Sequence, residues 1–447
     1  MKKRRIGATT LAISLLLGAG VAADAASKPK GALKAVGTLS SLALTSYDEG
    51  NWAVPDRTTV RENQAGQLEV ITYGASSAPH LTIQAYDATT LDAVGSRKVV
   101  SLPDWKRWGG MYAAPDGTFY ALMGRTNTKQ QDSFKTIAVQ RFSADWKKAG
   151  LGFVKGGVTQ GIKGIYAPFD AGTAAMVLVG DRLVVHTSRL MYKTGDGVRH
   201  QADYTFQVNT KTMGTKSFQA LGGAPYSSHS FSQKVIMTSG GNLVLVDHGD
   251  AYPRAIQMSV MKGFPAQREV KAYQLMKFPG GLGNNATGAT VTGLASGPQG
   301  ILVTGSSVRQ AVKGSTWNPD EKRNAYVISS SSTGRKKVHW LTSFSPKGSK
   351  DAGSTRIVQV APDRFVILFD VAERGQHRTI YRLVDSSGKV LSGATFTGVT
   401  YTDLMDPVLV GQRVYWVGKR VSASDRTAYL YGIDVADPTT PTLATLD

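Results

Sequence analysis

The chain has 447 residues, with 52 Lys and Arg against 32 Asp and Glu, and a formal charge of +20 at pH 7. It has no cysteine, which excludes disulfides, a cysteine-linked lipid anchor and metal–thiolate centres. A protein of this size without such cross-links depends on its buried core, and so basic a surface favours anionic partners.

The first 25 residues have the pattern of a secretory signal peptide. Four basic residues at positions 2–5 precede an apolar run from Ile6 to Val21, and small residues follow at 23–25. The run falls short of the ~20 residues that a spanning helix needs, although an uncleaved membrane anchor is the alternative. We expect a secreted, extracellular or cell-wall-associated protein without a transmembrane segment after cleavage. The Arg4–Arg5 pair leaves the twin-arginine route open.

Residues 26–35 contain several lysines and are expected to form a flexible leader, and residues 36–447 a single domain. This domain repeats one all-β unit seven times, each with a short strand, a tight turn, a second strand, a loop and a third strand. The second strands are predicted to begin at Leu68, Phe119, Leu183, Leu243, Ile301, Phe365 and Val414. Turns rich in Asp, Gly and Asn precede most of them, as a hairpin requires.

The third strands are predicted at His80–Tyr86, Thr136–Phe142, Tyr204–Val208, Ala255–Val260, Ala325–Ile328, Arg378–Val384 and Thr427–Ile433. Several of them end on an Asp or Asn followed by a tight turn, after which a fourth, outer strand is expected. This repeat predicts a seven-bladed β-propeller of four-stranded antiparallel blades. A β-solenoid or a pair of sandwiches is the alternative.

The apolar stretch Val36–Tyr47 precedes the first unit, and the seventh unit ends soon after its third strand. We therefore expect this stretch to supply the outer strand of the last blade and close the ring.

One face of the predicted ring carries most of the long, basic loops. In a propeller, the loop after the second strand and the chain entering the first strand open on the same face, around the central channel. Six of the seven histidines fall on this face by register, and only His339 lies on an expected outer strand. That polar residues collect in loops generally is the plainer explanation.

Units three and four are the densest in chemically active side chains. They contain His186-Thr187, Asp196-Gly197-x-x-His200-Gln201, Ser228-His229-Ser230-Phe231 and the segment from Asp247 to Arg254, Asp-His-Gly-Asp-Ala-Tyr-Pro-Arg. This region resembles a group of uncharacterised exported bacterial propeller proteins in which the same segments recur in this order. The resemblance implies a shared site across roughly residues 160 to 260, without indicating a reaction.

The predicted ligand-binding residues are His186, Arg189, Tyr192, His200, His229, His248, Asp250 and Arg254. Of these, His186, His200, His229, His248 and Arg254 are expected to form one site at the rim between the third and fourth blades, with Tyr192, Tyr226, Tyr252 and Trp317 on rim loops. If the site is catalytic, the candidates are His229, His248, Tyr252 and Arg254. If a divalent metal binds, the candidate ligands are His186, His200, His229, His248 and Asp250, and Asp247 is a further candidate.

Three functions from different classes remain open. The first is binding of an anionic cell-wall polymer, an acidic polysaccharide or a protein partner, in which Arg, His and Tyr donate to carboxylate or phosphate. The second is an enzyme, a lyase or hydrolase of an acidic glycan, possible with or without a metal. The third is a structural or scaffolding role. We expect a monomer. Nucleic acid is not an expected partner. The sequence contains no phosphate-loop, zinc-protease or nucleophile-elbow motif.

Overall fold

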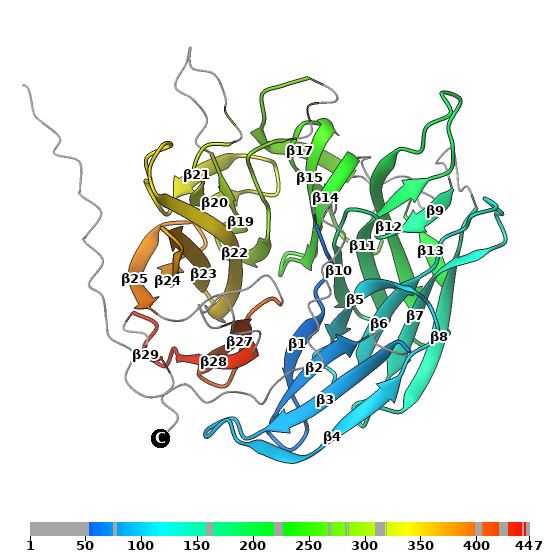
Figure 1. Cartoon of the computed structure of the whole chain (residues 1–447), viewed down its shortest axis with the longest axis horizontal. Helices are drawn as coiled ribbons and strands as arrows, with labels where there is room; N and C mark the ends of the chain where they lie inside the picture. Colours follow the sequence, from blue (N-terminus) through cyan, green and yellow to red (C-terminus); the bar gives the residue numbers. More distant parts are fainter. Residues whose placement is uncertain are drawn as a thin grey trace, which may run out of the picture.

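A computed structural model of the chain describes residues 53–74, 78–157, 164–218, 227–266, 270–281, 284, 286–308, 318, 320–397, 405–419, 428–439 and 442–443 (Figure 1). The signal and leader segments and the stretch Val36–Tyr47 lie outside these residues. Regular structure in the described part is β-strand throughout, and this part holds no helix that could cross a membrane.

The strands form five four-stranded antiparallel sheets and one nine-stranded sheet. The first two of the four-stranded sheets are β1 (Thr58–Glu62), β2 (Leu68–Gly74), β3 (His80–Tyr86), β4 (Ala93–Ser101), and β5 (Arg107–Ala113), β6 (Phe119–Gly124), β7 (Lys135–Phe142), β8 (Lys148–Lys155). The other three are β18 (Gly293–Gly297), β19 (Gly300–Ser307), β20 (Asn324–Ser330), β21 (Lys336–Trp340), then β22 (Lys350–Ala361), β23 (Arg364–Glu373), β24 (Gln376–Val384), β25 (Val390–Thr397), and β26 (Val408–Val410), β27 (Arg413–Lys419), β28 (Ala428–Asp434), β29 (Thr442–Leu443).

The nine-stranded sheet consists of two antiparallel runs and a short extra strand. Its strands are β9 (Ile165–Pro168), β10 (Ala174–Val179), β11 (Arg182–Met191), β12 (Gln201–Asn209), β13 (Thr215–Ser217), β14 (Ser228–Met237), β15 (Leu243–Tyr252), β16 (Ala255–Met261) and β17 (Val270–Lys277). The runs β10–β13 and β14–β17 join where Ala202 of β12 pairs with Ser228 of β14. We call the region between β11, β12, β14 and β15 the seam.

The first strands of successive runs form a closed ring. β1 contacts β5, and the contacts continue through β10, β14, β18, β22 and β26, which returns to β1. Each sheet then extends outward in chain order from its first strand. A ring of radially extended antiparallel sheets leaves no edge at its centre, and the fold is a β-propeller with four-stranded antiparallel blades.

The predicted strands agree closely with the observed ones. The second strands begin at Leu68, Phe119 and Leu243 as predicted, and the other four begin one residue earlier than predicted. β3 has the predicted bounds, and His339 lies on β21, an outer strand, as expected.

The turns that follow the third strands share one side-chain device. The first residue of the turn accepts backbone N–H bonds through its side chain, which fixes the chain reversal into the outer strand. The Asp and Asn members are Asp87, Asn209, Asp385 and Asp434. Ser143 and Ser331 do the same with a hydroxyl oxygen, which the sequence reading did not detect.

These turns also dock on the neighbouring sheet. A side chain of one sheet donates to a turn carbonyl of the next, as in Arg61 to Ala144, Arg141 to Thr210, Tyr381 to Pro438 and Tyr415 to Ala88. The last of these pairs, at 2.7 Å, joins the final sheet to the first. One repeated turn therefore fixes both the geometry of its own sheet and its spacing to the neighbour.

The ring closes by packing between the ends of the described chain. Tyr415, Val417 and Leu430 of the last sheet pack with Val60 and Val70 of the first. The outermost strand of the last sheet is β29, from the C-terminal end, so it takes the place predicted for Val36–Tyr47. The physical reason is that the chain continues past β28 through a turn long enough to reverse and pair again.

Replacing Asn209 by Ala should lower the free energy of unfolding by about 1 kcal/mol, because the N–H groups of Lys211 and Thr212 lose their acceptor. Asn209→Asp keeps the acceptor and serves as the matched control. Urea denaturation of both variants measures the difference. Equal stability of the Ala variant and the wild-type protein would contradict this role of the turn residue.

Candidate functional site

The predicted site residues divide into three groups in the structure. His186 and Arg189 are buried in the seam on β11. His229, His248, Asp250 and Arg254 lie on β14, β15 and the turn that follows β15. Tyr192 and His200 lie between β11 and β12, and Tyr226 and Trp317 lie outside the described residues.

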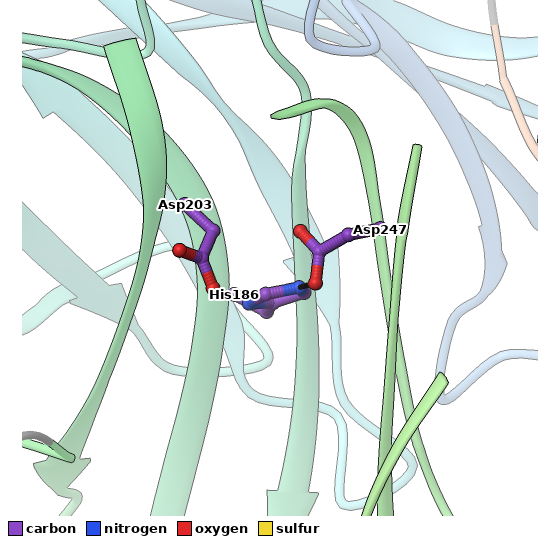
Figure 2. Close-up of side chains that lie close together, drawn as sticks. All are labelled: His186, Asp203 and Asp247. Carbon is purple, nitrogen blue, oxygen red and sulfur yellow. Dashed lines mark ion pairs between the residues drawn. The ribbon is translucent and has the colours of Figure 1, made fainter. Parts of the chain in front are cut away.

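The seam contains a buried group of three ionisable side chains, His186 of β11, Asp203 of β12 and Asp247 of β15 (Figure 2). His186 is 0% exposed and both aspartates are buried. Nε2 of His186 lies 3.1 Å from Oδ2 of Asp247. Figure 2 shows the two carboxylates on either side of the imidazole. The seam group therefore joins strands from both runs of the nine-stranded sheet.

Neighbouring polar groups orient each member of the seam group. Nδ1 of His186 lies 2.8 Å from Oγ1 of Thr205, on the facing position of β12. The Ser230 hydroxyl donates to Oδ1 of Asp247 at 2.6 Å. The backbone N–H of Ser227 donates to Oδ1 of Asp203 at 3.0 Å.

Burial and mutual repulsion govern the protonation of the seam group. Burial, followed by the charge of Asp247, raises the pKa of Asp203 to about 7. Burial alone would lower the pKa of His186, but the charges of Asp247 and Asp203 outweigh it and the pKa is raised. The two carboxylates therefore require a nearby positive charge to remain ionised together.

Arg189 supports the backbone of the seam and does not face a ligand surface. Its Nη1 donates to the backbone carbonyl of Asp203 at 2.7 Å, and its guanidinium lies 4.9 Å from the ring centroid of Tyr204. Since Arg189 is buried, the structure gives it a packing position in place of the predicted rim position.

Asp203 was missed by the sequence analysis. The sequence did offer an indication of its role, because Asp203 is a charged residue inside the strand β12. The other residues of this strand up to Val208 are also buried. Within the described residues, the group that could hold a metal ion is His186, Asp203 and Asp247. Of the predicted metal ligands, His186 and Asp247 belong to it, whereas His200, His229, His248 and Asp250 do not.

A second pair of ionisable side chains, His229 and Asp250, lies at the start of β14. Nδ1 of His229 lies 3.2 Å from Oδ1 of Asp250; the histidine side chain is 37% exposed and the aspartate side chain 2%. The pairing of β14 with β15 shifts register between Ser228 and Ser230, and His229 has a φ of +51°. This bulge turns a non-glycine residue into a rarely occupied conformation and re-aims its side chain, as bulges beside functional sites do.

The carboxylate of Asp250 controls the charge of His229. The contact with Asp250 raises the pKa of His229 above its ordinary value, although burial opposes this rise. At neutral pH the imidazole is therefore more often protonated than a free histidine would be. A buried carboxylate that orients a half-exposed imidazole is suited to proton transfer.

Arg254 fixes the loops that flank Asp250. Its guanidinium donates to four backbone carbonyls, those of Asp250, Pro279, Asn284 and Ala286. A guanidinium with so many backbone partners holds loops together, so these contacts give Arg254 a structural role, and ligand binding by Arg254 stays a prediction.

His248 and Tyr252 have surroundings that differ from those of His229 and Asp250. The His248 ring makes edge contacts with Phe231 and Phe278, and its Nε2 lies 2.9 Å from Oγ1 of Thr287. Burial lowers the pKa of His248 to about 4, so this ring is neutral at pH 7. Tyr252 is 71% exposed on the surface.

Tyr192 and His200 do not join the seam group. The Tyr192 hydroxyl accepts a bond from the Asn127 amide at 2.7 Å, and the ring is buried. Nε2 of His200 lies 2.8 Å from Oδ2 of Asp196, four residues earlier in the same loop. Each side chain has a partner outside the seam group, so the residues predicted to form one rim site do not all meet.

A cationic groove of about 780 Å³ lies between β21 and the turn that follows β24. Its charged lining residues are Arg335, Lys336, Lys337, His339 and Lys389, and no carboxylate lines it among the described residues. Trp340 also lines the groove. The sequence analysis placed the basic surface on the ring face and did not predict a groove at the outer strands.

Burial, and after it repulsion between cations, lowers the pKa values of two residues that line the groove. Burial and the charge of Lys277 lower the pKa of Lys336. Burial and the charge of Lys337 lower the pKa of His339. An anion placed here would relieve both effects.

The central cavity, of about 820 Å³, differs from the cationic groove in the balance of its charges. Arg356 lies 3.2 Å from a carboxylate oxygen of Asp56 and 2.6 Å from one of Asp406, which also pairs with Lys234 at 3.4 Å. The cations of this cavity are thus neutralised by carboxylates from the protein.

No family model matches the chain, and no curated protein matches it in sequence. Similar solved structures include hydrazine synthase from Kuenenia stuttgartiensis, with 12% identity over 87% of this chain and 99% of that chain and a TM-score of 0.46. The α-L-arabinofuranosidase of family GH93 from Fusarium graminearum in complex with arabinobiose has 11% identity over 86% and 93%, and a TM-score of 0.41. A protein of unknown function from Dyadobacter fermentans has 12% identity over 75% and 96%, and a TM-score of 0.42.

Replacing Asp250 by Asn should lower the pKa of His229, because the negative charge that favours the imidazolium is removed. A histidine whose folded-state pKa is raised stabilises the fold below the unfolded pKa of about 6.5 and loses this contribution as the pH rises through the folded value. NMR titration of the histidine ring protons measures the change. Asp116→Asn, in a turn of another sheet, is the control, and an unchanged His229 titration in the Asp250 variant would contradict the pairing.

Proposed function

We propose that the protein is an exported propeller that binds an anionic polymer, an acidic polysaccharide or an anionic cell-wall polymer, in the cationic groove. The observation that carries this proposal is a built concave surface with four Lys and Arg side chains and a histidine, and no carboxylate among its described lining residues. The net charge of +20 supports the same class of partner.

The geometry of the groove favours a polymer over a small anion. Its cations come from two sheets, with Arg335, Lys336 and Lys337 at β21 and Lys389 in the turn before β25. Gly388 allows this close approach, because a Cβ there would lie 2.8 Å from the His339 ring. An extended ligand with repeated negative charges can contact both sheets at once, and Trp340 offers an apolar surface to a sugar ring.

The seam and the central cavity support this role less well. The cations of the central cavity already have carboxylate partners, so an anion would have to displace them. The seam group is enclosed and cannot admit a polymer.

We further propose that the ring has seven blades and that the mature chain is a secreted monomer. Two four-strand runs within the nine-stranded sheet, joined at the single pair Ala202 and Ser228, support the count of seven. The basic and apolar pattern of residues 1–25 supports export.

A second candidate function is the enzymatic one, a lyase or hydrolase of an acidic glycan with His229 as proton acceptor. It is favoured by one specific observation, the strained and half-exposed His229 whose imidazole is paired with the buried Asp250. Binding remains the first choice because no second proton donor contacts His229 among the described residues.

The double substitution Lys336→Gln and Lys337→Gln should weaken binding to a polyanion such as heparin or alginate at least tenfold. The slope of log affinity against log salt concentration should fall by about two, one for each cation removed. Isothermal titration calorimetry at several salt concentrations measures both quantities.

Lys148→Gln with Lys155→Gln is the matched control, because it removes two exposed outer-strand lysines of β8 and changes the net charge equally. An equal loss in both double variants would mean that binding follows net charge alone, and the groove would not be the site.

For the enzymatic candidate, His229→Ala should abolish turnover of polygalacturonate or alginate, followed by the ultraviolet absorbance of unsaturated uronate and by new reducing ends. His200→Ala, which removes an exposed histidine also paired with an aspartate, should leave turnover unchanged. Turnover that survives in the His229 variant would rule out this residue as the base.

A further inference from the structure

The three side chains of the seam group share a pattern that their burial alone does not explain. In each, one polar atom is held by a neighbour: Nδ1 of His186 by Thr205, Oδ1 of Asp203 by Ser227 and Oδ1 of Asp247 by Ser230. One nitrogen or carboxylate oxygen from each of the three residues lies within 4.8 Å of those of the other two.

Two of the remaining polar atoms of the group have no hydrogen bond within the described part of the chain. They are Nε2 of His186 and Oδ2 of Asp203, both fully buried. Nε2 of His186 is close to Asp247, at 3.1 Å, but without hydrogen-bond alignment. A buried carboxylate oxygen without a partner is costly, so it points to a ligand that the oxygen is placed to receive.

The charge of the group indicates what that ligand is. Metal ligation requires the imidazole neutral and both carboxylates ionised. In that state the group carries a charge of −2, which one divalent cation neutralises. Arg189 also lies nearby, but its Nη1 bond goes to the backbone carbonyl of Asp203. A dication would thus satisfy the orphaned atoms and the charge together.

We propose that His186, Asp203 and Asp247 bind one divalent transition-metal ion, of which zinc is the test case. A nitrogen and two carboxylate oxygens are a donor set that zinc accepts, whereas calcium prefers oxygen ligands throughout. The Thr205 and Ser230 contacts act as outer partners that orient the ligands. The hydroxyl of Ser227, also buried and without a hydrogen bond among the described residues, is a further donor beside Asp203.

This metal site is independent of the proposed polymer binding, because it lies in the nine-stranded sheet and the groove lies between two other sheets. A zinc ion here would bind β11, β12 and β15 together, and so hold the two runs of the sheet in register across the seam. Its loss should destabilise the fold and leave the groove cations unchanged.

The test uses the full mature chain, treated with a chelator and then titrated with zinc alone. We expect one tightly bound zinc per chain by calorimetry and by metal analysis, and a higher melting temperature with zinc than without. Asp203→Asn should lose this binding. Thr205→Val, which removes only an outer partner and keeps the side-chain shape, should weaken it by about 10- to 100-fold.

His200→Ala is the matched control, because His200 also contacts an aspartate but at the surface. Zinc binding that persists in this variant and falls in the Thr205 variant supports the seam site, even if the Asp203 variant does not fold. A wild-type chain that binds no zinc would overturn the proposal. So would zinc binding that is lost in the His200→Ala variant and kept in the Asp203→Asn variant.

Discussion

The contact between His186 and Asp247 is the interaction on which the middle of the ring depends. It joins β11 to β15 across the seam, where β12 and β14 share a single residue pair. Ionisable groups removed from water cost several kcal/mol unless each is paired, and breaking a buried pair typically costs about 3 to 5 kcal/mol. The polar neighbours of the seam group therefore form hydrogen bonds that support it. Ser230 bonds to Asp247, and Gln201 and Gln233 bond to Ser230.

The other joints of the ring combine apolar packing with side-chain bonds to the docked turns, as Tyr415 makes with Ala88. The joint between the first two sheets also contains a buried ion pair, Arg61 with Glu69 at 2.8 Å. Two polar features carry the proposals, the seam with its buried ionisable groups and the groove, which has no carboxylate among its described lining residues.

The sequence predicted the strands well because the evidence for them is local. A hairpin turn and an apolar run determine a strand such as β6 or β15 without reference to its neighbours. The Asp and Asn turn residues were also predicted, since Asp385 and Asn209 act on the next few residues of their own turn.

The sites could not be predicted in the same way, because they depend on contacts between sheets. Asp203 is linked to His186 only by the pairing of β12 with β11, and Lys389 joins Lys337 only when one sheet packs on the next. The Arg254 side chain donates to loop carbonyls such as that of Ala286, and the His248 ring packs against aromatic residues such as Phe278. Neither set of contacts could be inferred from the local sequence. The composition indicated a basic surface for an anionic partner, but it did not indicate which strands form that surface.

The central claim is that the buried charges of the seam are balanced by a bound cation. The most direct measurement is an anomalous difference map at the zinc absorption edge, from crystals of the mature protein grown with zinc. The account predicts one strong peak between the imidazole of His186 and the carboxylates of Asp203 and Asp247. A map without a peak there, with the His186 ring hydrogen-bonded directly to Asp247, would contradict it.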